Sequence, residues 1–102
     1  ILEKHKLWLQ GNKEGVRANL RGVNLSGVNL SGVNLSGADL SDADLSDADL
    51  RHTDLENANL SGANLSFAYL ESANLKGANL KGADSIGANL EDANLSKEKQ
   101  ND

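Results

Sequence analysis

Residues 18–97 follow one pattern of apolar and polar positions that repeats every five residues, sixteen times in succession. Each repeat has a small apolar residue, then Asn or Asp, then Leu, then two positions that are mostly polar or Gly, as in residues 23–27, VNLSG. The Leu is present in fifteen of the sixteen repeats, and Ser85 is the exception. Residues two apart in an extended segment face the same side, so the small residue and the Leu point inward. The last two positions supply turn chemistry, so each repeat predicts a very short strand followed by a corner.

A helical interpretation of the same pattern fails. A Leu every five residues advances about 500° around a helix, so the Leu side chains would not form one stripe. Gly holds the last position of eight of the sixteen repeats, which weakens a helix further. A fixed short period without interruption predicts a solenoid, in which neighbouring units bury the apolar sides of one another.

The motif resembles the pentapeptide-repeat family, whose consensus is A(D/N)LXX, and the resemblance covers residues 18–97. It implies an all-β solenoid, a right-handed quadrilateral parallel β-helix with four repeats per coil and therefore four coils. Residues twenty apart should then lie in one column, and we expect a core column of four Leu residues: Leu20, Leu40, Leu60 and Leu80.

The N-terminal residues interrupt the repeat, and residues 1–17 are predicted to form a capping helix and a linker. Residues 1–10 carry apolar side chains and one histidine at helical spacing: Ile1, Leu2, His5, Trp8 and Leu9. An uncapped solenoid end would expose backbone groups and apolar side chains, so we expect this helix to cover the first coil. Three small inward positions of that coil are Val, which would fill the space beneath Trp8. We therefore expect Trp8 to be substantially buried.

The C-terminal residues 98–102 are predicted to be a polar tail, too short for a stable amphipathic cap. The last coil would then present apolar side chains and an unpaired edge. Either the tail folds over this end, or the chain continues, or two molecules meet end to end. We predict an end-to-end homodimer through the last coil.

Four residues that depart from the repeat are expected to lie close together in space. Phe67 occupies a corner, Tyr69 replaces an outward Asn, Ile86 fills an outward polar position, and Ser85 replaces an inward Leu. One coil separates residues 66 and 86, so Phe67, Tyr69 and Ile86 should cluster as a candidate interaction patch. The alternative is a set of isolated surface residues, with Ile86 turned inward in place of Ser85.

Composition and charge argue against most kinds of chemistry. The net charge is −5 and there is no basic stripe, so direct nucleic-acid binding is not expected. There is no cysteine, and no apolar run long enough to span a membrane. A belt of acidic residues in the second coil diverges around the rod, so we expect no metal or cofactor there. A catalytic triad could be proposed from Ser46, Asp49 and His52. A convex surface offers no substrate pocket, however, so we expect no enzyme activity.

Three functions remain open. The first is a scaffold or interaction module that recognises an unidentified protein partner. The second is implied by the family resemblance, since some pentapeptide-repeat proteins are DNA mimics that bind DNA gyrase or topoisomerase. The third is a structural domain of a larger, membrane-tethered protein, a kind that the family resemblance associates with cyanobacteria. With no targeting segment in the sequence, the expected location is cytoplasmic.

Overall fold

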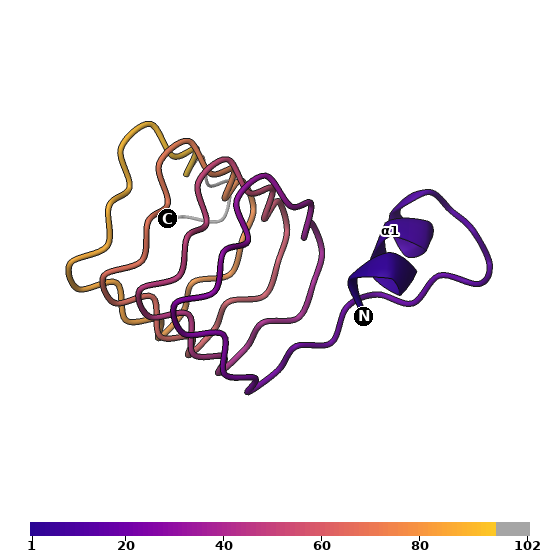
Figure 1. Cartoon of the computed structure of the whole chain (residues 1–102), viewed down its shortest axis with the longest axis horizontal. Helices are drawn as coiled ribbons and strands as arrows, with labels where there is room; N and C mark the ends of the chain where they lie inside the picture. The colour runs from indigo at the N-terminus through magenta and orange to yellow at the C-terminus, as the bar shows by residue number, and fades with distance from the viewer. Residues whose placement is uncertain (96–102) are drawn as a thin grey trace.

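The computed structural model describes residues 1–95. It comprises one helix, α1 (Leu2–Leu9), followed by four stacked coils. In Figure 1 the coils succeed one another from purple to yellow, and α1 lies beside the first coil. The predicted polar tail at residues 98–102 and the last two residues of the sixteenth repeat lie outside the described residues.

The coils are held by parallel bridges between residues twenty apart. One column of bridges links Asn19, Asp39, Asn59 and Asn79, and the other three sides follow the same register. On each side a main-chain N–H donates to the next coil, as from Leu20 to the Asp39 carbonyl at 2.7 Å. The predicted right-handed quadrilateral β-helix is therefore confirmed. Each side contributes a single bridge rather than a longer strand, because a corner follows every few residues.

The corners share one backbone conformation. The last residue of every repeat described has a φ between 59° and 75°, whether it is Gly or not. The residue after it donates its N–H back to the Leu carbonyl, as from Val23 to Leu20 at 3.1 Å. A positive φ at the third residue of such a turn is the pattern of a type II turn. This geometry explains why Gly is so frequent at the last position.

The Asn and Asp side chains secure these corners. In each of the first fifteen repeats except that of Tyr69, an Oδ1 atom accepts a hydrogen bond from the main-chain N–H two residues later, as between Asn34 and Ser36 at 3.0 Å. The residues that accept in this way are Asn19, Asn24, Asn29, Asn34, Asp39, Asp44, Asp49, Asp54, Asn59, Asn64, Asn74, Asn79, Asp84 and Asn89. Asn and Asp are suited to this bond because their short side chains mimic a backbone turn.

The Leu side chains fill the centre of the rod. They are fully buried in the two middle coils and become more exposed at both ends. One column of the rod contains, in successive coils, Leu20, Leu40, Leu60 and Leu80, as expected from the twenty-residue register. At the C-terminal end Leu95 is exposed, which is compatible with the end-to-end dimer, and that dimer stays a prediction.

Ser85 is exposed and lines a pocket at the end of the last coil. The space has a volume of about 160 Å³ and is lined by Leu65, Leu70, Leu75, Leu80, Ala83, Ser85, Leu90 and Leu95. The side chain of Ile86 is 70% exposed, so Ile86 does not turn inward to fill this space. We expect Ser85→Leu to raise the free energy of unfolding by about 1–2 kcal/mol, since it buries several methyl and methylene groups. Urea denaturation measures this gain, and a variant no more stable than the parent would contradict it.

The cap differs from expectation at Trp8. The Trp8 side chain is 40% exposed, and the buried residue of α1 is instead His5, at 1%. The indole lies over the corner at Gly37, where a Cβ atom would approach its ring to 3.0 Å. Val28 is consequently exposed, so the prediction of a buried Trp8 is wrong. Within α1 only His5 is buried, and α1 covers only part of the first coil.

Candidate interaction surface

Phe67, Tyr69 and Ile86, which we call the aromatic corner, belong to the third and fourth coils. Their side chains are 57%, 50% and 70% exposed, respectively. The Phe67 N–H donates to the Ile86 carbonyl at 2.9 Å, so these two residues are neighbours across the coils. Solvent-exposed apolar groups that lie together on an otherwise polar surface are a common feature of contact sites.

Phe67 is held in a conformation that most side chains avoid. Its φ is 59°, in the left-handed region that the other corner residues, which are Gly, Asp, Asn, Ser or His, also adopt. A bulky side chain in this region is uncommon and costs about 1–2 kcal/mol. The phenyl ring lies against Gly87, where a Cβ atom would come within 2.5 Å of two ring carbons. Gly87 therefore leaves the room that the ring occupies.

Tyr69 removes a hydrogen bond from its repeat. Its side chain has no oxygen that can reach the N–H two residues later, so the bond that Asn or Asp makes at the equivalent position is lost there. A hydrogen bond of this kind contributes about 0.5–1.5 kcal/mol to folding. The ring is half exposed.

Ile86 is fixed outward by the turn to which it belongs. Its N–H donates to Asp84 Oδ1 at 3.1 Å, as in the other repeats. The main chain thus keeps its regular path although Ser85 has replaced the inward Leu. The side chain of Ile86 is presented to solvent at the end of the column that contains Ser46 and Ser66.

Charged groups flank the aromatic corner. Asp49 precedes Tyr69 in its column, and its carboxylate accepts two bonds from the Arg51 guanidinium, at 2.8 and 2.6 Å. The hydrogen bonds from the Arg51 side chain and N–H lower the pKa of Asp49 to about 2. In the next coil Glu71 Oε2 accepts a bond from Asn89 at 3.1 Å. An apolar centre with a polar rim is the usual composition of a protein interface.

In the acidic belt of the second coil, carboxylates take part in the corner turns. Asp39 and Asp44 have lowered pKa values because each accepts hydrogen bonds from a serine hydroxyl and N–H in its own turn. Within residues 1–95 no group of three or more potential ligands is arranged to hold a metal ion.

The residues of the hypothetical triad are engaged separately. The Ser46 hydroxyl donates to Asp44 at 2.7 Å, the Asp49 carboxylate is bound by Arg51, and His52 occupies a corner with a φ of 60°. The structure therefore does not bring them into a nucleophile–base arrangement.

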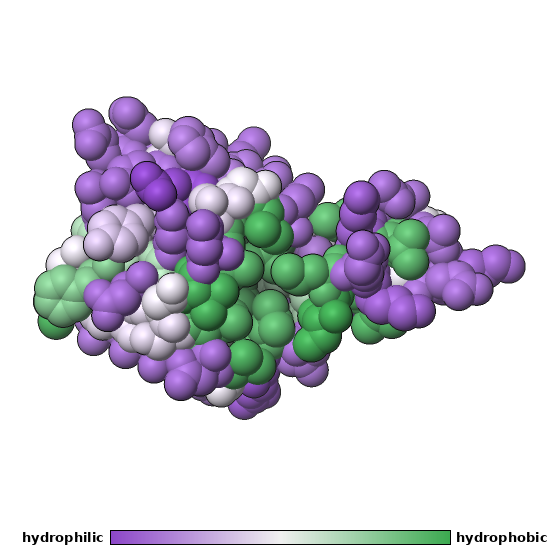
Figure 2. Space-filling model, in the orientation of Figure 1, coloured by the Kyte–Doolittle hydropathy of each residue, from purple (hydrophilic) through white to green (hydrophobic). Residues whose placement is uncertain are grey.

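Sequence reasoning did not predict a groove between α1 and the first coil. Leu2, Leu9 and Val33 are among its lining residues, and its volume is about 520 Å³. Figure 2 shows apolar side chains gathered where the solenoid meets α1. The available signal in the sequence is the set of three valines in the first coil, of which Val33 lines the groove. Over residues 1–95, no helix has the length and apolar character needed to cross a bilayer.

The family model for pentapeptide repeats, in 8 copies, matches residues 18–57, 38–77 and 58–96. A comparison with curated proteins gave no match. Among solved structures, the chain is similar to QnrB1, a plasmid-mediated fluoroquinolone resistance protein, with 27% identity and a TM-score of 0.61. That similarity covers 78% of this chain and 44% of QnrB1.

Two proteins of the cyanobacterium Nostoc are also similar. The pentapeptide repeat protein alr5209 from Nostoc PCC 7120 is 34% identical, with a TM-score of 0.46 over 86% of this chain and 73% of that one. HetL from Nostoc sp. strain PCC 7120, involved in the regulation of heterocyst differentiation, is 38% identical, with a TM-score of 0.42 over 78% of this chain and 52% of that one. The chain thus spans about half the length of QnrB1 and HetL.

Proposed function

Because the chain belongs to the pentapeptide-repeat family, we propose that it is a non-enzymatic interaction module that binds a partner protein through the aromatic corner. The regular surface of the rod supplies a rigid support. The irregular residues supply the apolar contact.

The observation that carries this proposal is the cost of the aromatic corner to the scaffold. Phe67 holds a strained φ, Tyr69 forfeits a turn hydrogen bond, and Ile86 exposes most of its side chain. The other non-Gly residues that hold a positive φ at a corner within residues 1–95 are Asp, Asn, Ser or His, so Phe67 is the one large apolar residue described there. Strained or destabilising residues that persist at one place are typical of functional sites.

Restoring the repeat at these positions should separate binding from stability. We expect the variant Phe67→Gly, Tyr69→Asn, Ile86→Ser to be about 1–2 kcal/mol more stable than the parent, because it relieves the strained φ and regains one turn bond. It should also lose the partner. Urea denaturation measures the first effect, and quantitative capture from native lysate measures the second.

A photo-crosslinking residue at position 67 keeps this test specific, because it labels only a protein seated on the aromatic corner. His52→Gly is the matched control, since it restores Gly at a corner outside the patch and should leave capture unchanged. If the triple variant captured the same protein as the parent with equal efficiency, the proposal would be wrong.

The DNA-mimic alternative has one observation in its favour, the similarity in fold to a fluoroquinolone resistance protein. The acidic residues oppose it, because they form a transverse belt around the second coil rather than lengthwise stripes that resemble two phosphate backbones. A gyrase supercoiling assay distinguishes the two functions. Inhibition at micromolar concentration that persists in the triple variant would favour the mimic.

A third proposal, a structural domain of a larger protein, predicts that the aromatic corner contacts another part of the same polypeptide. The crosslinking experiment on the full-length gene product separates this from a partner in trans.

A further inference from the structure

His5 connects α1 to the solenoid. Its ring is almost completely buried, and Nδ1 accepts a hydrogen bond from the Ala18 N–H at 2.9 Å. Ala18 is the first residue of the first coil. The bond therefore joins the cap directly to the start of the β-helix.

This bond requires a neutral imidazole. An Nδ1 atom that accepts a hydrogen bond carries no proton, so the proton lies on Nε2. Nε2 is also buried and has no hydrogen-bond partner within residues 1–95. Protonation would place an N–H on Nδ1, facing the Ala18 N–H, and would leave a buried charge.

The groups around the ring oppose its protonation on balance. Burial is the main cause that lowers the pKa of His5, and the positive charge of Arg17 lowers it further. The Ser36 backbone faces the ring and partly offsets this effect by favouring the charged form. Trp8 stacks on the imidazole, with 5.3 Å between ring centroids, and contributes no charge.

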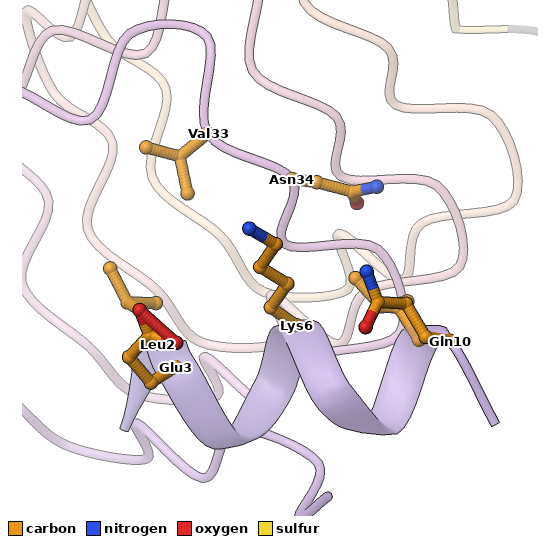
Figure 3. A pocket seen from close by; sticks show the side chains of 7 residues that line it. Leu2, Glu3, Lys6, Gln10, Val33 and Asn34 are labelled. Carbon is orange, nitrogen blue, oxygen red and sulfur yellow. The ribbon is translucent and has the colours of Figure 1, made fainter. Parts of the chain in front are cut away.

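The other attachment of α1 to the coils is apolar, through the Trp8 ring over the corner at Gly37. The bond from the Val16 N–H to the Lys4 carbonyl, at 2.9 Å, closes the cap on itself and does not reach the solenoid. On the other flank the groove separates α1 from the first coil, and Figure 3 shows Lys6 and Gln10 extending across it toward Asn34. His5 is thus the principal polar link between the cap and the coils.

We infer that α1 is a pH-sensitive cap, which His5 releases from the first coil when its imidazole becomes protonated. Release uncovers the side of that coil against which α1 lies, at Val33 and Asn34, and the Asn34 N–H donates no main-chain hydrogen bond within residues 1–95. An exposed parallel edge of this kind is a reactive feature that β proteins normally cover.

The direction of the pH dependence follows from the lowered pKa. In the released cap the imidazole returns to an ordinary pKa of about 6.5, so above that pH neither state is protonated and the cap is fully stable. As the pH falls below about 6.5, protons bind the released state preferentially, and each further pH unit favours release up to about tenfold, until the pKa of the docked state is reached. The solenoid should remain folded over this range, because Asp39, Asp44 and Asp49 stay ionised.

Trp8, the only tryptophan, reports release through acrylamide quenching of its fluorescence. Between pH 7.5 and 5 we expect quenching of the parent protein to rise, while far-ultraviolet circular dichroism of the coils stays constant. His5→Asn should not show this rise, because its Oδ1 can accept the Ala18 bond but does not titrate. His52→Asn is the matched control and should behave as the parent. Equal pH dependence in the parent and in His5→Asn would overturn the inference.

An NMR titration of the parent chain provides a test that does not depend on any variant. The Ala18 amide resonance should change with the same midpoint as the His5 imidazole, below about 6.5. If His5 titrated while the Ala18 amide remained unchanged, the ring would not be the link that holds the cap.

Discussion

Leu50→Ala is expected to lower the free energy of unfolding by about 2–5 kcal/mol, the range for Leu truncation in a tight core. Leu50 is fully buried in the second coil and lies in a column between Leu30 and Leu70. The coils on either side are fixed by main-chain hydrogen bonds at every side, as from Leu50 to the Tyr69 carbonyl at 2.7 Å. They cannot collapse into the vacated space, so the cavity remains. For a chain of this length each kcal/mol corresponds to about 4–8 °C in the melting temperature.

Leu95→Ala provides the matched control, because it removes the same atoms from a side chain that is 43% exposed at the end of the rod. Its effect should be well below that of Leu50→Ala. In a solenoid each unit is stabilised by its neighbours, so a central defect weakens two interfaces and a terminal one weakens fewer. Urea denaturation monitored by circular dichroism compares them. Equal losses for both variants would mean that the column is not the source of stability.

The coils could be predicted from the sequence because every repeat has the same local preference for a short strand followed by a corner. The inward Leu, the turn-forming positions and the unbroken period of five agree with one another, and one register satisfies them all. The family resemblance then supplied the number of repeats per coil, which the period alone does not contain. The twenty-residue bridges from Asn19 to Asp39 and onward confirm it.

The role of the Asn and Asp side chains was only partly predictable. Their outward position follows from alternation, but alternation would accept any polar residue. The bond from Oδ1 to the N–H two residues later explains the restriction to these two types. That restriction was visible in the sequence, and the exception at Tyr69 marks a candidate site for the same reason.

The cap was less predictable because it lies outside the repeat. Helical spacing groups His5 with Trp8 and Leu9, but it does not say which of them lies deepest. Trp8 was expected inside because the valines of the first coil would fill the space beneath it. The structure buries His5 instead, because its ring nitrogen satisfies the Ala18 N–H that would otherwise lack a partner at the start of the coil.

Gly15→Ala is expected to detach the loop of the cap from α1 and to destabilise the cap by about 1–3 kcal/mol, the usual cost of overpacking. A Cβ atom at Gly15 would lie 2.0 Å from the Trp8 main-chain nitrogen and 2.4 Å from its Cα atom. The obstacle is helix backbone, which cannot rotate away as a side chain can. The loop must therefore move, and the Val16–Lys4 hydrogen bond should break with it.

The sequence alone would have attributed this glycine to flexibility, because glycine recurs at the corners with a positive φ. Gly15 is the one glycine of the chain without such a φ, so its role is the close approach of two backbones. Gly11→Ala makes the converse control, because that residue has a φ of 76° and a Cβ atom there would meet nothing within 4 Å. Gly11→Ala should cost about 1–2 kcal/mol through conformational strain while Trp8 keeps its quenching at neutral pH. Gly15→Ala should increase that quenching at neutral pH. If Gly15→Ala left Trp8 as protected as in the parent, the loop would not pack on α1 as the structure places it.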